Sequence, residues 1–217
     1  MTSVRPQLVE QELYTLYSRP GSGGFAVEAA FRLAGQPFTL VNVPKQAPGD
    51  DFLAISPLGQ VPVLTLPCGR SITESGAMVT LVAERFPEAE LAPQPQSPGR
   101  AEFLRWMFFM SSALYPALLR YFYAQRYTSD PGAAETVQNA ALAESDRCFA
   151  VIENALSGRQ WLVDDRFSLA DVYLLMLAHW HPVGDRPREE WTNIVRHCSA
   201  LKRQPVLADL NETHRLW

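Results

Sequence analysis

The first 90 residues alternate between short runs of β-type residues and stretches with helical spacing. Runs rich in β-branched and aromatic residues predict strands over 12–17, 37–43, 61–66 and 70–73. Apolar residues spaced three and four apart predict two helices between and after them, over 25–34 and 74–86. The order strand, helix, strand, then a Pro/Gly-rich segment, two strands and a helix is typical of a small open sheet that carries helices.

The chain after residue 99 shows helical spacing and no convincing strand. From 100 to 127 the apolar residues recur every three or four positions, which predicts one long helix. Pro116 is expected to kink it, because an interior proline removes a backbone hydrogen bond and clashes with the preceding turn. Further helices are predicted near the C-terminus and over 133–156, 168–179 and 189–201.

Residues 87–99 separate these two halves. The segment (PEAELAPQPQSPG) holds four prolines and few residues that could fill a core, so it has the composition of a linker. We therefore predict an α/β domain over 12–90, a linker over 91–99 and an all-helical domain over 100–217.

Composition and charge exclude several classes of function. The chain is 47% hydrophobic and 19% charged, ordinary for a globular protein. A net charge of -4 with no block of Lys and Arg argues against a nucleic acid partner. No apolar run approaches the roughly 18 residues that span a bilayer, and residues 1–12 lack a signal-peptide stretch. These features predict a cytoplasmic protein with no membrane partner.

The cysteines and histidines do not predict a metal site or a disulfide. Cys68, Cys148 and Cys198 are far apart and form no C-x-x-C pair, so each is expected to be a small buried residue. His179 and His181 have no third ligand nearby in sequence and are expected to be packing or surface groups. We expect no metal.

The segment Gly59–Leu64 (GQVPVL), followed by Ile72–Ser75 (ITES), is the most informative motif of the first half. Pro62 opens a strand, a position where a proline need not donate to the sheet and where a cis bond can occur. Ser75 begins a helix, where free N–H groups form a site for an anion such as a ligand carboxylate. The alternative is that Thr73 or Ser75 only caps this helix.

These motifs resemble those of the glutathione S-transferase superfamily, in its bacterial, serine-type form. The resemblance implies a thioredoxin-like first domain and an all-helical second domain. It also implies that the Val61–Pro62 bond is cis, that the backbone of Val61 pairs with the cysteinyl part of glutathione, and that Glu74 and Ser75 hold its γ-glutamyl end. For the glycyl carboxylate this chain offers only Lys45, with Gln46 and Gln60 as neutral candidates.

The segment Phe167–Val172 (FSLADV) extends the resemblance into the second half, from about residue 12 to 210. Ser168 and Asp171 have the spacing of a capping box, in which each side chain satisfies a backbone N–H of the other residue. This element has a structural role and no chemical one.

The turn Tyr17–Phe25 (YSRPGSGGF) joins the first strand to the first helix and, in the family, faces the ligand thiol. Family members use a Tyr, Ser or Cys from this region, and the P-G-S sequence favours Ser22 as the catalytic hydroxyl. Ser18 and Tyr17 are the alternatives. Ser22 could also serve only as a helix cap.

A hydrophobic electrophile would lie between the two domains. Its pocket is predicted to include Phe25, Trp106, Phe109 and Tyr115, with Phe122 and Tyr123 as further candidates on the long helix. An aromatic stripe at helical spacing is more often core than pocket, and the spacing does not distinguish the two.

The resemblance implies a detoxifying enzyme that conjugates reduced glutathione to small hydrophobic electrophiles or uses it to reduce peroxides. It also implies a homodimer and glutathione as co-substrate. A disulfide reductase would need a cysteine near residue 22, and none is present. The alternative from another class is a non-catalytic, transferase-like binding or regulatory protein, against which the retention of Ser22, Glu74 and Ser75 argues.

Overall fold

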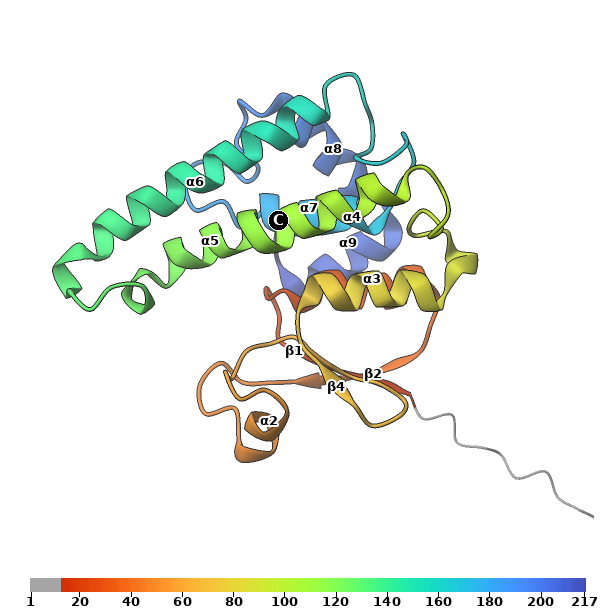
Figure 1. Ribbon diagram of the computed structural model, residues 1–217, viewed down its shortest axis with the longest axis horizontal. Coiled ribbons are helices and arrows are strands. Elements are labelled where there is room, and N and C mark those ends of the chain that lie inside the picture. The colour runs from red at the N-terminus through yellow and green to blue at the C-terminus, as the bar shows by residue number, and fades with distance from the viewer. Residues whose placement is uncertain (1–12) are drawn as a thin grey trace, which may run out of the picture.

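Four short strands near the N-terminus form one mixed sheet (Figure 1). The computed structural model describes residues 13–217. The strands lie in the order β2-β1-β3-β4, with β1 parallel to β2 and the other neighbours antiparallel. Their bounds are Tyr14–Ser18 for β1, Phe38–Asn42 for β2, Val63–Thr65 for β3 and Ser71–Ile72 for β4.

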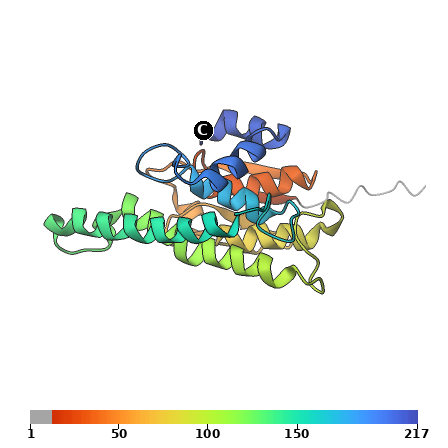
Figure 2. The same ribbon diagram turned by 90° about the horizontal axis from the view of Figure 1, so that it is seen from above.

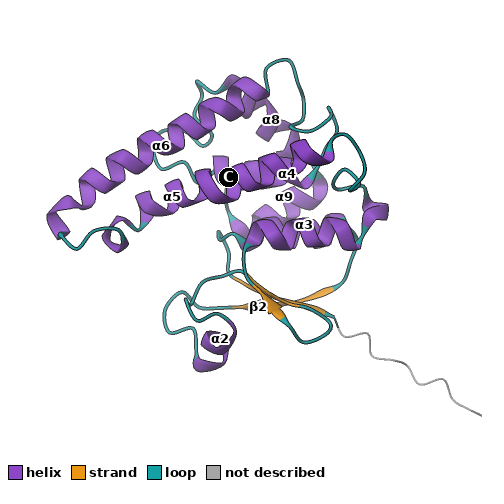
Figure 3. Cartoon of the chain, viewed as in Figure 1, coloured by secondary structure: helices purple, strands orange, loops and turns teal. Residues whose placement is uncertain are grey.

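Helices cover both faces of this sheet. Helices α1 (Gly24–Leu33) and α3 (Ser75–Arg85) pack on the face turned toward the rest of the chain, and α2 (Asp50–Ile55) lies on the other (Figure 3). Successive side chains of a strand point to opposite faces. Leu16 of β1 accordingly joins the main core with α1 and α3, whereas its neighbour Tyr17 packs on the small cluster around Phe52 of α2.

The rest of the chain is helical. It contains α4 (Arg100–Phe109), α5 (Tyr115–Phe122), α6 (Ala134–Ala155), α7 (Leu169–Ala178), α8 (Thr192–Lys202) and α9 (Pro205–His214). Short turns of 3-10 helix lie at Pro87–Ala89, Ala124–Arg126 and Pro131–Ala133. Helix α5 runs beside α6, and together they project to one side of the molecule (Figure 2).

A wide, π-helical turn over Met110–Leu114 joins α4 to α5. The sequence predicted a single helix kinked at Pro116. The structure confirms an irregularity near this proline and shows that it takes the form of a π-helical turn. Proline has no N–H to offer the carbonyl four residues earlier, so the helix widens before it instead of continuing its regular bonding.

Helix α7 lies at the centre of the molecule, and all ten of its residues are buried. Helices α1 and α3 of the sheet region pack against it, and α1 also packs against α9. The main core is therefore continuous from the sheet into the helical region. The sheet region and the helical region are therefore packed against each other through one core.

The predicted fold class is confirmed: a thioredoxin-like region with a small mixed sheet is followed by an all-helical region. The predicted strands and helices are present with ends displaced by at most three residues, except that the helix predicted over 100–127 is divided into α4, the π-helical turn and α5, which ends at Phe122. The absence of a signal peptide was predicted for residues 1–12, which lie outside the described residues, as does the predicted start of the first domain at residue 12.

The prediction that each cysteine is buried is wrong for Cys68. Cys148 and Cys198 are buried, but Cys68 is exposed because it lies in the tight turn between β3 and β4, next to Gly69. Its pKa is lowered by hydrogen bonds from Arg70. Within residues 13–217, no helix combines the length and apolar character that crossing a membrane requires.

Candidate functional site

A cavity of about 460 Å³ opens between the sheet region and the helical region. Its size falls in the range of small-molecule sites. Loops before α1 and around α2 form one wall and α5 forms the other, as the arrangement in Figure 3 indicates. The lining residues are Arg19, Pro20, Gly21, Ser22, Gly23, Lys45, Gly59, Gln60, Val61, Tyr115, Leu119, Phe122, Tyr123, Arg126 and Trp180.

Ser22 lines this cavity, two residues before α1 begins. Its hydroxyl donates to the carbonyl of Arg19 at 2.7 Å and accepts from the N–H of Gly24 at 3.2 Å. The second contact is the local capping role that the sequence allowed for this serine. The hydroxyl therefore lies where the helix presents free N–H groups and a partial positive charge, which favour an anion.

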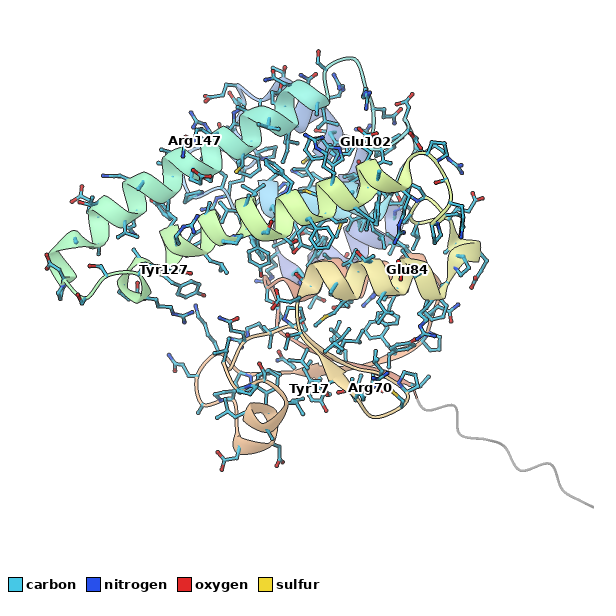
Figure 4. All side chains as sticks on the ribbon, in the orientation of Figure 1. Tyr17, Arg70, Glu84, Glu102, Tyr127 and Arg147 are labelled. Carbon is cyan, nitrogen blue, oxygen red and sulfur yellow. The ribbon has the colours of Figure 1, made fainter. Side chains whose placement is uncertain are left out.

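The two alternative hydroxyls lie elsewhere. Ser18 is buried, and its Oγ lies 3.4 Å from Ser22 Oγ, beneath Gly24. The fit is so close that a Cβ on Gly24 would stand 1.7 Å from Ser18 Oγ. Tyr17 lies on the α2 side of the sheet, its ring 6.0 Å from that of Phe52 (Figure 4). Of the three candidates, only Ser22 is among the residues that line the cavity.

Gly59, Gln60 and Val61 line the cavity, Pro62 does not, and the Val61–Pro62 bond is cis. Buried Ser56 braces the segment: its hydroxyl donates to the carbonyl of Gln60 at 2.8 Å, and the N–H of Gln60 donates back to it at 3.2 Å. Lys45, Gln60 and Val61, which the sequence assigned to glutathione, all line the cavity.

Glu74 and Ser75 lie at the N-terminus of α3, beside the cavity and not among its lining residues. Ser75 is buried and its hydroxyl bonds to that of Tyr173 on α7 at 2.8 Å. Glu74 is exposed and has φ of 67°, in the left-handed region that non-glycine residues rarely adopt. Backbone strain of this kind is concentrated at functional sites.

Tyr115 brings the helical region against the Ser22 turn. A Cβ on Gly23 would lie 2.6 Å from Tyr115 Oη, so only glycine leaves room for this hydroxyl. Burial raises the pKa of Tyr115, and the nearby Tyr173 and Glu74 raise it further. Tyr115 therefore presents a neutral O–H to the cavity. Its ring packs 5.1 Å from that of Trp180, which also lines the cavity.

Of the predicted aromatic residues, Tyr115, Phe122 and Tyr123 line the cavity, and the structure does not bring the other three to it. Phe25 is fully buried between His214 and Trp217, and Trp106 is 1% exposed in the core. Phe109 packs beside Trp106, with ring centroids 5.9 Å apart. These three side chains lie on helix faces that meet the shared core, and none of them lines the cavity.

Sequence analysis missed four cavity residues: Arg19, Leu119, Arg126 and Trp180. Arg19 lies inside the Tyr17–Phe25 turn that the sequence analysis identified, so its position next to Ser18 could have predicted that it lines the cavity. The other three come from α5, from the turn after it and from the end of α7. Their convergence depends on how α5 and α7 pack, for which the sequence has no local signal.

The turn before α1 is also held from the C-terminal end of the chain. The N–H of Gly21 donates to Nδ1 of His214, at the end of α9, with a distance of 3.3 Å. The other ring nitrogen of His214 lies 3.1 Å from a carboxylate oxygen of Glu28, which is buried on α1. Glu28 thus fixes His214, and His214 fixes the backbone next to Ser22.

Two family models match the chain, one in each half. The glutathione S-transferase N-terminal domain matches residues 16–90, and the glutathione S-transferase C-terminal domain matches residues 106–205. Between them they span both walls of the cavity.

Relatives and solved structures named as glutathione S-transferases resemble most of the chain. Glutathione S-transferase GstA of Escherichia coli O157:H7 is 28% identical over 198 residues, covering 89% of this chain and 95% of the relative. The beta-class glutathione S-transferase of Sphingomonas chungbukensis superposes with a TM-score of 0.81 at 26% identity, covering 94% of this chain and all of that one. A sphingomonad glutathione S-transferase in complex with glutathione gives a TM-score of 0.79 at 25% identity, with the same coverage.

The domain matches, the similarity to these relatives and the fold around the cavity all indicate the same family. The chain is a glutathione transferase of the glutathione S-transferase superfamily.

Proposed function

We propose that this protein conjugates reduced glutathione to small hydrophobic electrophiles, with the hydroxyl of Ser22 stabilising the glutathione thiolate. One observation carries the proposal: Ser22 is the one candidate hydroxyl of the β1–α1 turn that lines the cavity, and it lies at the N-terminal end of α1. A sulfur anion there gains from both the hydroxyl and the helix dipole.

Glutathione is expected to lie along the sheet side of the cavity. Its γ-glutamyl end is assigned to Glu74 and Ser75, its cysteinyl backbone to Val61, and its glycyl carboxylate to Lys45 with Gln60. The free N–H groups at the start of α3 favour the first carboxylate, and the ammonium of Lys45 favours the second. The thiol would then face Ser22, with the apolar wall of Tyr115, Leu119, Phe122 and Trp180 opposite.

The effect of Ser22 on the thiol can be bounded. Without ligand, its hydroxyl donates to the Arg19 carbonyl at 2.7 Å, and this bond must be given up to bind sulfur. That loss costs about 1 kcal/mol, and a bond to a charged group contributes roughly 1.5–3 kcal/mol. The net gain of about 1 kcal/mol lowers the thiol pKa by nearly one unit from its usual ~8.5. Roughly 15% of the bound glutathione would then be ionised at pH 7.

Ser22→Ala is expected to raise the pH midpoint of the conjugation rate by about one unit, because the thiolate loses a hydrogen bond. The deficit in kcat/KM is therefore large below pH 7 and fades at high pH, where glutathione ionises without help. The measurement is a pH profile of kcat/KM with a chloronitroaromatic acceptor.

Ser18→Ala is the matched control, because it removes a hydroxyl 3.4 Å from Ser22 Oγ that is buried outside the cavity. Its midpoint should stay at the wild-type value. If the midpoint moves in Ser18→Ala and stays fixed in Ser22→Ala, then Ser18 and not Ser22 supports the thiolate.

Ser75→Ala is expected to weaken glutathione binding by about five- to ten-fold, because a hydrogen bond to a carboxylate is lost at the start of α3. Calorimetric titration of the wild-type and variant proteins with reduced glutathione measures this directly. Unfolding in urea serves as the control, since Ser75 also bonds to Tyr173. Equal affinities for two folded proteins would remove Ser75 from the glutathione site.

The finer assignments follow from the same family. We include in the proposal a glutathione-dependent peroxidase activity, a detoxifying role in the cytoplasm and a homodimer, whose mass light scattering would measure. The rival function is that of a non-catalytic binding or regulatory protein. It would bind glutathione in the titration yet turn over neither electrophiles nor peroxides.

A further inference from the structure

Three cationic side chains line the cavity, Arg19, Lys45 and Arg126, and among the described residues no acidic side chain does so. None of the three forms an ion pair with another residue in the described range 13–217. Arg19 also has a buried Nε without a hydrogen-bond partner. The cavity thus concentrates positive charge in a protein whose net charge is -4. Such a surface attracts anions.

Two of these cations come from opposite walls and meet at one aromatic ring. The guanidinium of Arg126 lies over Tyr123, 4.2 Å from the ring centroid, and the ammonium of Lys45 lies 5.7 Å from the same centroid. Both side chains are exposed at the mouth of the cavity. Figure 4 shows Tyr127, the next residue after Arg126, at the outer end of α5, where the helical region faces the α2 loop. The ring holds each cation, and an anion between them would relieve their mutual repulsion.

Glutathione does not account for all this charge. As a thiolate it carries two carboxylates, one sulfur anion and one ammonium. In the proposed placement its γ-glutamyl end lies at Glu74 and Ser75, which are not lining residues. The glycyl carboxylate and the thiolate remain, and Lys45 and the Arg19–Ser22 turn lie on their side of the cavity. Arg126 comes from the helical side of the cavity, in the turn after α5.

We propose that the preferred electrophile carries a carboxylate, which Arg126 binds while the apolar body of the electrophile packs on Leu119, Phe122 and Trp180. This inference rests on the proposed conjugation and specifies its acceptor. A guanidinium suits the role because its planar fork can donate two parallel hydrogen bonds to one carboxylate. Stacking on Tyr123 restricts the side chain of Arg126, so less conformational freedom is lost when the acceptor binds.

The reaction with an aryl chloride of this class illustrates the chemistry. The glutathione sulfur forms a bond to the ring carbon that bears chlorine, and chloride leaves with the electron pair of the broken C–Cl bond. No proton moves in this step, because the thiol has already lost its proton to solvent. Arg126 holds the carboxylate on the far side of the ring and touches none of the reacting atoms, so it acts on acceptor selectivity.

The test compares two acceptors that differ only in charge: a chlorodinitrobenzoate with chlorine para to the carboxylate, and the matching benzamide. In Arg126→Gln the ratio of kcat/KM for the benzoate to that for the benzamide is expected to fall about ten-fold, the value of one lost charge-assisted hydrogen bond. Comparing this ratio between the wild-type protein and the variant cancels the difference in intrinsic reactivity of the two acceptors. Added salt should lower the same ratio in the wild-type protein, since exposed charges are screened.

Arg105→Gln is the matched control. Arg105 stacks on Trp106 at the same distance, 4.2 Å, but it lies on α4 outside the cavity, so its loss should leave the ratio unchanged. An equal loss for both acceptors in Arg126→Gln would overturn the inference. So would a raised KM for glutathione, because Arg126 would then be a glutathione ligand.

A binding measurement keeps this inference separate from the proposed conjugation. The two S-aryl glutathione conjugates can be made chemically and titrated by calorimetry, which needs no turnover. The carboxylate conjugate should bind about ten-fold more tightly than the amide conjugate and lose this advantage in Arg126→Gln. If the wild-type protein turns over neither acceptor but shows this preference, the conjugation fails and the carboxylate site stands. Equal affinities would overturn the site itself.

Discussion

Asp171→Ala is expected to lower the free energy of unfolding by about 3–5 kcal/mol. The carboxylate of Asp171 is completely buried at the start of α7. It accepts from the N–H of Leu162 at 3.0 Å, and from the N–H and hydroxyl of Ser168 at 2.8 and 3.1 Å. His197 Nε2 lies 3.5 Å away. Alanine would leave two backbone N–H groups buried without an acceptor, which is more costly than losing a helix cap alone.

Urea unfolding of the purified variant at neutral pH measures this loss. Ser168→Ala is the graded control, because it removes only the hydroxyl and keeps the backbone bond to Asp171; a loss of about 0.5–2 kcal/mol is expected. Since Asp171 does not line the cavity, glutathione affinity of the folded variant should be retained. A cost for Asp171→Ala no larger than that for Ser168→Ala would mean that Leu162 and Ser168 find other acceptors.

The role of Asp171 was only partly predictable from sequence. The spacing of Ser168 and Asp171 predicted the capping box, and the structure contains it. The bond from Leu162 was not predictable, because a capping box is local whereas Leu162 reaches Asp171 through the loop that precedes α7. Burial raises the pKa of Asp171, against which these donors act. The environment of Asp171 is set by the packing of α7 in the core, which the capping residues do not predict.

The cavity, too, was only partly predictable from the sequence. On the sheet side, four residues that the sequence assigned to the site line the cavity: Ser22, Lys45, Gln60 and Val61. They lie in loops or turns, where the local sequence pattern indicates the backbone geometry. On the helical side, spacing shows which aromatic residues share a helix face but not whether that face meets the core or the cavity. Phe25 and Trp106 face the core, which their spacing alone could not predict.

The contact between Gly21 and His214 joins residues 193 positions apart. No local pattern connects them, since a helix-terminal histidine and a turn glycine are each common. Only the packing of α9 on α1 brings the ring of His214 beneath the turn. The long-range support of the Ser22 turn is therefore a property of the folded chain, and it leads to a second large expected effect.

Glu28→Gln is expected to destabilise the protein by about 2–4 kcal/mol at neutral pH, because it breaks a buried pair on α1. Glu28 is 2% exposed and its two oxygens contact His214 at 3.1 Å and Arg32 at 2.9 Å. Burial alone would raise the pKa of Glu28, but the hydrogen bond from His214, together with the charge and hydrogen bond of Arg32, holds this pKa below its ordinary value. The folded state thus favours the ionised carboxylate.

The sign of the pH dependence follows from this lowered pKa. Between the folded and unfolded pKa values the unfolded chain binds more protons, so stability rises with pH in that window. The contribution of Glu28 is complete above the unfolded value, near ~4.3, and is lost as pH falls through the folded value. Urea unfolding of wild-type and Glu28→Gln proteins at several pH values should therefore show a stability difference that shrinks below about pH 4.3.

Glu212→Gln on α9 is the matched control, because Glu212 is exposed and forms no ion pair among the described residues. Its stability difference from wild type should be small at every pH. The Glu28 variant should also bind glutathione more weakly, since His214 loses the partner that directs its Nδ1 toward Gly21. A stability difference that stays constant down to pH 3 would show that Glu28 is not held in its ionised form. An unchanged glutathione affinity would show that the Ser22 turn keeps its shape without this support.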